Sequence, residues 1–322
     1  MWRGSVKLAV GLAFAMLVLT GCGDTPAPAN MQAPSETVGT SGAESSAGIS
    51  GDEAGKEPSA EETERRIVST TVAITQIMDR LEIDLVGIPK SVKTLPERYD
   101  KVTKVGNPMS PDMELVKSLK PTEVLSVTTL QYDLEPVFEN AGIEATFLDL
   151  TSLEKMQAEI VKLGEKYGKQ KKAAAIVNEY DATLEHIREA AEGKEKPTVL
   201  ILLGVPGSYL VATELSYIGD LVRLLGGINI VQGEKVEFLA SNTEYLQQAN
   251  PDVILRAAHG MPEEVVKMFD EEFKKNDIWH HFDAVQAGRV YDLEEKLFGT
   301  TSNLAVGEAL EALLPMLYPN QP

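Results

Sequence analysis

Apolar residues follow two spacings along the first half of the chain beyond residue 65. Short runs rich in β-branched and aliphatic residues predict strands, and segments whose apolar residues recur every three or four positions predict helices. The predicted strands are RIVST (66–70), DLVGIP (84–89), EVLSV (123–127) and TFLDL (146–150), and the predicted helices are TVAITQIMDRL (71–81), MELVKSL (113–119) and LQYDLEPVFENA (130–141). Thr70 or Thr71 is the predicted N-cap of the first helix.

The same alternation restarts in the second half of the chain. Its predicted strands are TVLILLGV (198–205) and DVILRAA (252–258), and its predicted helices are YIGDLVRLLGG (217–227), EYLQQA (244–249) and PEEVVKMFDEEFKKN (262–276). Strands that alternate with helices are typical of parallel βαβ units. We therefore predict an α/β protein with two Rossmann-like lobes.

A predicted helical segment, residues 153–194, connects the two halves. Gly164 and Gly168 predict an interruption near its start, and between Lys169 and Gly193 the sequence contains neither Gly nor Pro. A helix of more than 20 residues is more than about 30 Å long. We therefore expect a single long rigid helix between an N-terminal lobe, 65–152, and a C-terminal lobe, 195–322.

Residues 1–21 have the pattern of an export signal. Arg3 and Lys7 precede an apolar run, 8–19, that is shorter than the roughly 20 residues that span a bilayer. The run leads into Thr20-Gly21-Cys22, which resembles a bacterial lipobox and makes Cys22 the predicted lipidation site. Cys22 is the only cysteine, which excludes a disulfide and a cysteine-ligated metal site in the folded part.

Residues 22–64 combine the lipidated cysteine with a predicted disordered tether. Residues 23–64 contain nine acidic residues and one lysine, so they supply −8 of the net charge of −19, and they have no aromatic residue. The acidic balance and the lack of a basic patch argue against nucleic acid as a partner. The chain also lacks a P-loop and a G-x-S-x-G motif, which argues against the enzymes that depend on them.

Two residues stand where a ligand could be bound. Met109 lies between Pro108 and Pro111 just before a predicted helix, and His259 directly follows the predicted strand 252–258. Taken alone, Met109 is typical of a packing residue under a turn, and His259 of a structural histidine. Open α/β sheets, however, bind ligands at the carboxyl ends of their strands, where His259 lies.

The other histidines do not predict a metal site. His280 and His281 are adjacent, and adjacent side chains on a helix point about 100° apart, so such a pair rarely chelates one metal. His186 lies within the long helical segment and is expected to be exposed. Four dispersed histidines give poor support for a zinc site, which needs three or four ligands.

Several long segments resemble, in order, the IsdE-type haem-binding lipoproteins. These are substrate-binding components of bacterial ABC importers and have the helical-backbone, class III periplasmic-binding-protein fold. The resemblance covers residues 65–318. It is carried by RIVSTTVAIT, KTLPERY, LILLGVPGSYLVAT (200–213), SYIGDLVRLLGG (216–227), SNTEYL (241–246), RAAHGMPEEV (256–265), NDIWHHF (276–282) and RVYDLEE (289–295).

The resemblance implies that one haem per chain is held as transported cargo, with Met109 and His259 as the axial ligands of its iron. Haem iron accepts such His/Met pairs, whereas a thioether is a poor ligand for a ferric siderophore, zinc or manganese. The family also implies propionate contacts near Val72, Ser91, Val92 and Lys93. The expected start of the first helix, Thr70-Thr71-Val72, offers the free N–H groups that stabilise an anion. Tyr209 either lines the cleft or fills the core.

The resemblance further implies that Glu114 and Glu244 pair with arginines on a dimeric ABC permease. The two residues begin matching segments, Glu114-LVKSLK-Pro121 and Glu244-YLQQAN-Pro251. The expected protein is a monomer that is anchored by lipid to the outer face of the cell membrane, in a Gram-positive envelope. We expect it to receive haem from cell-surface haem-binding proteins.

Three alternatives remain open on the sequence. A ferric-siderophore or cobalamin receptor of the same fold would leave Met109 without a function. A surface haem-degrading or iron-reducing enzyme would need an open coordination site for oxygen chemistry, which two axial ligands do not leave. A purely structural surface lipoprotein would use neither Met109 nor His259.

Overall fold

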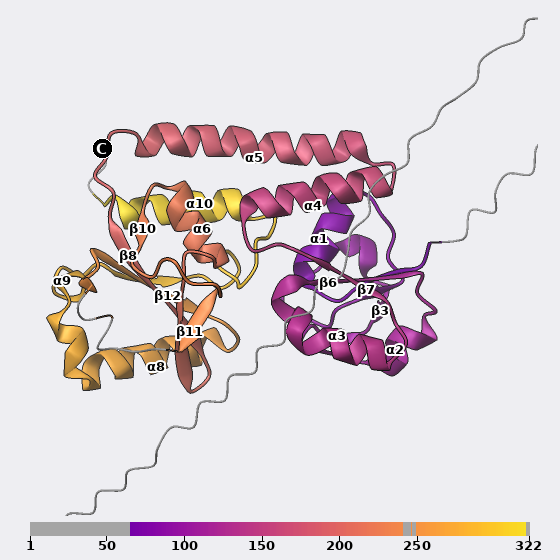
Figure 1. Cartoon of the computed structure of the whole chain (residues 1–322), viewed down its shortest axis with the longest axis horizontal. Coiled ribbons are helices and arrows are strands. Elements are labelled where there is room, and N and C mark those ends of the chain that lie inside the picture. The colour runs from indigo at the N-terminus through magenta and orange to yellow at the C-terminus, as the bar shows by residue number, and fades with distance from the viewer. Residues whose placement is uncertain (1–64, 241–245, 247–248, 320–322) are drawn as a thin grey trace, which may run out of the picture. The chain divides into compact units, whose positions relative to one another are not determined.

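Two β-sheets organise residues 65–240, 246 and 249–319, which the computed structural model describes (Figure 1). Each sheet forms one lobe, and helices cover both of its faces. The segments predicted as export signal and tether, 1–64 with Cys22, lie outside the described residues, as does Glu244. Within the described part of the chain, no helix is long and apolar enough to cross a membrane.

The N-terminal lobe contains a five-stranded sheet of order β3-β2-β1-β6-β7 in which every pair is parallel. Its strands are β1 (Ile67–Ser69), β2 (Gly87–Ile88), β3 (Thr103–Lys104), β6 (Glu123–Val127) and β7 (Ala145–Leu148). Its helices are α1 (Val72–Arg80), α2 (Met113–Ser118) and α3 (Gln131–Asn140), with the short 3₁₀ helices η1 (Glu97–Tyr99) and η2 (Thr128–Leu130). The parallel βαβ prediction is confirmed in this lobe.

The C-terminal lobe contains a six-stranded sheet of order β11-β9-β8-β12-β13, with β10 paired to β8. Its strands are β8 (Thr198–Val205), β9 (Ser208–Ala212), β10 (Ile228–Asn229), β11 (Phe238–Ala240), β12 (Val253–Ala258) and β13 (Val290–Leu293). Its helices are α6 (Tyr217–Leu224), α8 (Pro262–Lys275), η3 (Asp277–His281), α9 (Asp283–Gln286) and α10 (Val306–Leu317).

This second sheet differs from the prediction in its antiparallel edge. β8 turns directly into β9, and β11 pairs with β9 in antiparallel fashion. The turn is Pro206-Gly207, and Gly207 has φ +82°, a conformation that glycine adopts at no steric cost. A Pro-Gly pair between two apolar runs therefore favours a hairpin over the parallel crossover that we predicted.

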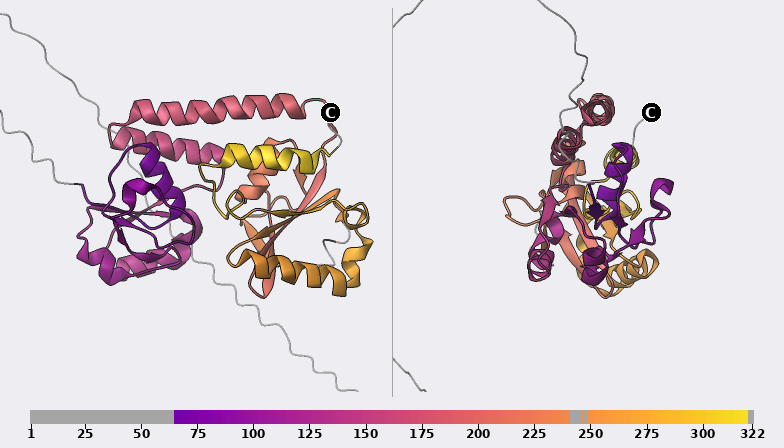
Figure 2. Two further views of the ribbon diagram at one scale, coloured as in Figure 1. Left: turned by 180° about the vertical axis from the view of Figure 1, so that it is seen from behind. Right: turned by 90° about the vertical axis from the view of Figure 1, so that its right-hand side faces the viewer.

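The connecting segment consists of two helices, α4 (Leu153–Lys166) and α5 (Gln170–Ala191). The predicted interruption is present, because Gly168 adopts φ +70° directly after α4. Gly164 has another function inside α4: a Cβ atom there would lie 2.5 Å from the Cβ of Ala173, so its absence lets α4 and α5 approach closely. α5 extends alongside both lobes in Figures 1 and 2.

One face of α5 joins the two lobes through a shared apolar core. Its buried residues are spaced three or four apart, as expected for a helix with one buried face. They are Ala173, Ile176, Tyr180, Leu184 and Ile187. They belong to a cluster that includes core residues of α1 in one lobe and of α6 and α10 in the other. Because this packing continues across both lobes, the helix is a rigid connection.

Candidate functional site

A cavity of about 680 Å³ is lined by residues of both lobes. The N-terminal lobe contributes the start of α1, the 91–96 loop and the end of β6. The C-terminal lobe contributes the end of β8, the residue after β12 and the 295–305 loop. Ligand sites for small molecules and cofactors commonly have volumes of about 300–1,000 Å³. Met109 and His259, predicted from opposite halves of the chain, both line this cavity.

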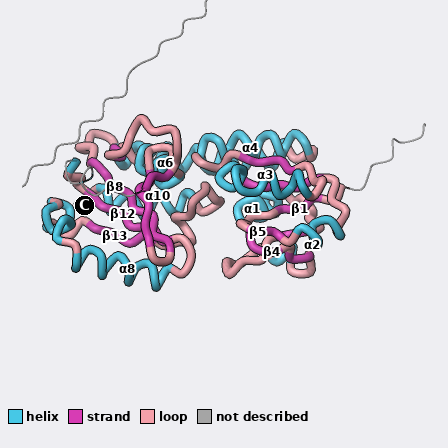
Figure 3. The backbone as a smooth tube through the Cα atoms, turned by 60° about the horizontal axis from the view of Figure 1, so that its bottom comes forward, coloured by secondary structure: helices cyan, strands magenta, loops and turns pink. Residues whose placement is uncertain are grey.

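Met109 occupies the tip of a tight hairpin. The strands β4 (Gly106–Asn107) and β5 (Ser110–Pro111) pair in antiparallel fashion, which leaves Pro108 and Met109 as the two turn residues (Figure 3). Pro108 restricts the backbone, and the side chain of Asn107 accepts a 2.9 Å hydrogen bond from the Met109 N–H. Met109 is 62% exposed. It is therefore a fixed, accessible thioether at the cavity and does not fill the core.

The hairpin leads directly into α2, and the N-cap of that helix fixes the junction. One carboxylate oxygen of Asp112 accepts hydrogen bonds from the N–H groups of Glu114 and Leu115, both at 3.1 Å. The Asp112 N–H in turn donates to the carbonyl of Val105 at 2.7 Å. The position of the thioether thus depends on local turn and cap chemistry that the sequence itself encodes.

His259 extends from the centre of the other sheet. β12 lies between β8 and β13, and all six of its residues are buried. The His259 N–H donates to the carbonyl of Gly204 at 2.8 Å, which continues the β8 pairing by one residue. Burial lowers the pKa of His259, and Lys93 acts in the same direction while Glu295 opposes it. The neutral imidazole, which is the form that binds metal, is favoured.

The start of α1 offers backbone donors to the cavity. Thr71 is its N-cap, and the Thr71 hydroxyl accepts a 3.4 Å hydrogen bond from the N–H of Ile74. Thr71, Val72 and Ala73 line the cavity. The N-terminal N–H groups and dipole of a nine-residue helix therefore face a space where an anionic group would be stabilised.

The 91–96 loop places two of the predicted residues in the cavity and one outside. Ser91 and Lys93 line it, and the Ser91 hydroxyl accepts a 2.9 Å hydrogen bond from the Lys93 N–H. The Lys93 ammonium donates to the backbone carbonyl of Glu295 in the other lobe at 3.4 Å. Val92 is fully exposed and is not among the residues that line the cavity.

Thr70 and Tyr209 also lie outside the lining of this cavity. Thr70 is buried, and its hydroxyl donates to the carbonyl of Leu125, which fixes β1 beside β6. The Tyr209 ring packs against Phe269 and Trp279, with ring centres 5.8 and 6.2 Å away. Of the two functions that we considered for Tyr209, core packing in the C-terminal lobe agrees with this placement.

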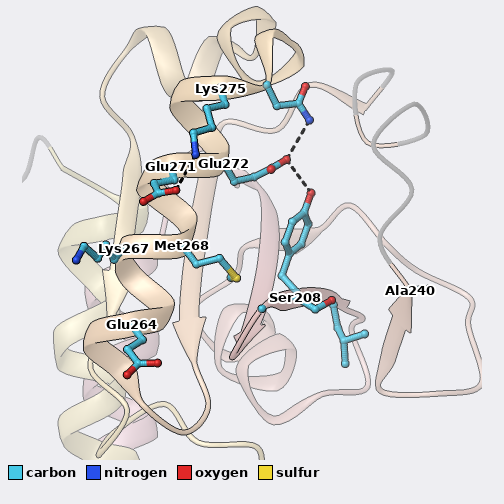
Figure 4. Close-up of a pocket in the computed structure, with 12 residues that line it drawn as sticks. Ser208, Ala240, Glu264, Lys267, Met268, Glu271, Glu272 and Lys275 are labelled. Carbon is cyan, nitrogen blue, oxygen red and sulfur yellow. Dashed lines mark hydrogen bonds and ion pairs between the residues drawn. The ribbon is translucent and has the colours of Figure 1, made fainter.

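Tyr209 borders a different cavity of about 850 Å³ between α8 and the β9–β11 edge (Figure 4). One face of α8 borders it with Glu264, Lys267, Met268 and Glu271, and the Met268 sulfur points into the space between helix and sheet. The Glu272 carboxylate accepts hydrogen bonds from Tyr209, Asn276 and Trp279. This acidic group is satisfied within the lobe.

The cavity residues that the sequence interpretation missed include two glutamates. Glu295 follows β13 and Glu237 precedes β11, and both line the cavity. Burial raises the pKa of Glu237, and the negative charge of Asp149 adds to this effect against the opposing influence of Lys155. No sequence motif predicts either glutamate as a cavity residue. Each reaches the cavity because the neighbouring strand is placed there by its pairing in the sheet.

The remaining histidines and Glu114 are exposed, as was expected for His186. His186, His280 and His281 are exposed, and His280 lies 3.1 Å from the carbonyl of Phe273. No group of three potential metal-binding residues of the His, Cys, Asp and Glu types occurs in the described ranges. Glu114 is exposed in the first turn of α2.

Two α/β lobes, a rigid connecting helix and a cavity lined from both sides define a binding protein of the class III fold. The chain belongs to the periplasmic binding protein family, whose model matches residues 67–297. The high-affinity heme uptake system protein IsdE of Staphylococcus aureus (strain Newman) is 48% identical to it over 256 residues, which are 79% of this chain and 88% of that protein.

Two solved structures are similar over nearly their whole length. The crystal structure of an ABC transporter substrate-binding protein from Listeria monocytogenes EGD-e is 58% identical, has a TM-score of 0.76 and covers 80% of this chain and 100% of its own. The crystal structure of S. aureus IsdE complexed with heme is 48% identical, has a TM-score of 0.77 and covers 79% of this chain and 99% of its own. The predicted fold class is confirmed.

Proposed function

We propose that this protein binds haem between its lobes and delivers it to an ABC permease for iron acquisition. The observation that carries the proposal is the presence of Met109 and His259, from opposite lobes, in one cavity. The similarity to a haem-bound structure at 48% identity supports the same ligand. The protein is a transport receptor and not an enzyme, and one haem per chain is its cargo.

The thioether of Met109 and the imidazole of His259 are the proposed axial ligands. This pair suits haem iron and stabilises its ferrous state. Because the lowered pKa keeps His259 neutral, no proton has to leave before the nitrogen binds iron at neutral pH. With ligands on both lobes, the porphyrin lies edge-in across the cavity.

The proposed propionate site is the start of α1 together with Ser91 and Lys93. Val72 and Thr71 supply backbone and hydroxyl groups at a helix N-terminus, and Lys93 supplies a positive charge. Thr70 and Val92 lie outside the cavity lining. Thr70 fixes β1 beside β6, and Val92 lies between Ser91 and Lys93, which are joined by a hydrogen bond.

The test is an absorption titration of residues 65–322 with haemin, followed by reduction. We expect a saturating one-to-one Soret shift and sharp low-spin α and β bands after reduction. Weak, broad absorbance would contradict the proposal and would favour a ferric siderophore or cobalamin as the ligand. Loss of bound haem on incubation with a reductant and oxygen would instead favour a haem-degrading enzyme.

The proposed anchor is a lipid on Cys22, with residues 23–64 as the tether to the outer face of the cell membrane. The lipobox-like sequence supports it. Cell-surface haem-binding proteins are the proposed donors, and the receptor acts as a monomer. Release of the Cys22→Ala protein into the medium is expected. Unchanged membrane association of that variant would contradict the anchor.

The proposed permease contacts are Glu114 and Glu244, one on each half of the chain. Glu114 is exposed on α2, on the same lobe as Met109, and is free to meet a basic partner. We expect a Glu114→Ala, Glu244→Ala double variant to bind haem normally and to import it more slowly in cells. Normal uptake of haem iron by this variant would refute the docking assignment.

A further inference from the structure

Glu295 and His259 follow two neighbouring strands, β13 and β12. The two strands are parallel, with Arg256 opposite Asp292 and Ala257 opposite Leu293. β12 ends at Ala258 and β13 at Leu293, so His259 and Glu295 both lie just beyond the ends of these paired strands. Both residues line the cavity between the lobes.

An ion pair of the buried Arg256 side chain fixes this register just before the site. The Arg256 Nε and Nη2 atoms lie 2.7 and 2.6 Å from the two carboxylate oxygens of Asp292, and Nη2 lies 2.9 Å from Asp270 on α8. Arg256 is only 8% exposed. A bidentate contact of this kind is directional, so it prevents the strands from sliding past each other.

The Glu295 side chain turns back toward the histidine. Its Oε1 atom accepts a 3.2 Å hydrogen bond from the N–H of Gly260, the residue that directly follows His259. Its charge also acts on the imidazole of His259. The carboxylate therefore lies beside the backbone that carries the proposed ligand.

We propose that the Glu295 carboxylate positions the His259 imidazole by accepting a hydrogen bond from the ring nitrogen that does not bind iron. This inference rests on the proposed haem-binding function and adds a residue to it. A metal-bound histidine commonly donates its second N–H to a carboxylate, which fixes the ring orientation and makes the nitrogen a stronger donor. Glu295 thus sets both the strength and the reduction potential of the iron site.

Glu295 also connects the two lobes through its backbone. Its carbonyl accepts the hydrogen bond from the Lys93 ammonium, which belongs to the proposed propionate site. This contact does not involve the carboxylate. Substitutions of the Glu295 side chain therefore leave the carbonyl that binds Lys93 in place. Their effects on haem binding report on the contact with His259.

The experiment compares Glu295→Ala, Glu295→Gln and Glu294→Ala in the haem-loaded protein. Glu294 is the matched control, because it carries the same charge one residue away, is largely exposed and pairs with Lys296. The measurements are the haem dissociation rate and the reduction potential of the bound iron.

We expect Glu295→Ala to accelerate dissociation about 10- to 100-fold, as loss of an outer-shell partner does in metal sites, and to shift the potential in the positive direction. A weaker imidazole donor stabilises the ferric state less, which explains the sign of the shift. Glu295→Gln retains an acceptor and loses the charge, so the potential moves in the same direction with a smaller change in dissociation. Glu294→Ala leaves both quantities unchanged.

Equal potentials and dissociation rates in the parent protein and both Glu295 variants would overturn the inference while the proposed function stands. Equal shifts in the Glu294 and Glu295 variants would also overturn it, because the effect would then be one of overall charge. A parent protein that shows no low-spin haem spectrum would overturn the proposed function, and with it this inference.

Discussion

The two lobes present their proposed ligands in different ways. His259 directly follows a buried strand that lies between two others, and its N–H donates to the carbonyl of Gly204, so the sheet determines its backbone position. Met109 lies at the tip of a two-residue turn and is 62% exposed. The comparison teaches that one ligand is held by the tertiary fold, and the other by local turn chemistry.

The two sheets also differ, in the length of their strands. Strands of two to five residues form the parallel N-terminal sheet, whereas the C-terminal sheet is built around the eight-residue β8. We therefore expect substitutions at the His259 end to impair the iron site directly. Substitutions of residues that flank Met109 should act through the hairpin that carries it.

The largest effect is expected for His259→Ala. Loss of an outer-shell partner lowers affinity in metal sites by up to about 100-fold. Removal of His259, a proposed direct ligand, should lower haem affinity by more than that. Haemin titration measures the loss, and the low-spin bands of the reduced protein should disappear.

The control for this prediction is His280→Ala, since His280 is exposed and does not line the cavity. It should bind haem as the parent protein does. Equal affinity of the His259 and His280 variants would remove His259 from the site.

The next effect concerns the stability of the Met109 hairpin. Gly106 has φ +105°, and a Cβ atom there would lie 2.9 Å from the backbone nitrogen of Asp112. Gly106→Ala should therefore lower the free energy of unfolding by about 2 kcal/mol, the range for a residue held in a strained conformation. Urea denaturation measures it, and haem affinity should fall because Met109 is displaced.

Gly142→Ala is the matched control for Gly106→Ala. Gly142 also has a positive φ, +68°, but a Cβ atom there would meet nothing within 4 Å. It should cost about 1 kcal/mol in stability and leave haem binding unchanged. If the two variants lost haem affinity equally, the hairpin would not be what positions Met109.

The smallest of the three effects is expected for Met109→Leu. The substitution retains apolar volume and removes the thioether, so haem affinity should fall about tenfold, or about 1.4 kcal/mol. The low-spin bands should be lost while His259 still binds the iron. The loss should be greater for the ferrous than for the ferric protein, because a thioether favours ferrous iron.

Met261→Leu is the control here, because Met261 is also exposed, at 53%, and does not line the cavity. Its spectrum should match that of the parent protein. A Met109→Leu spectrum identical to the parent would show that another group occupies that side of the iron.

Much of the fold could be predicted because it is encoded locally. The buried run of β8 and the amphipathic spacing of α8 set these elements where the sequence predicted them, and Thr71 is the N-cap of α1. The β8–β9 hairpin was missed although its Pro-Gly turn was visible. β8 and β9 form an antiparallel pair and not the expected βαβ unit, because a two-residue connection can only join antiparallel strands.

The candidate site was predictable to a smaller extent. Met109 and His259 were predicted because prolines and a strand end mark them, together with the resemblance to a family, and both line the cavity. Tyr209 occurs in a similarly apolar segment, yet it packs beside Phe269 and Trp279. A residue's position along the chain does not determine which side of a short strand faces a cavity.

The sequence by itself determined the two lobes, the long helix after Gly168 and the turn that presents Met109. Each depends on residues that are neighbours in the chain. Only the tertiary structure decided that Met109 and His259 share one cavity and that Glu295 lies beside His259. Those placements depend on strand register and on packing along α5, which arise from contacts between residues far apart in the sequence.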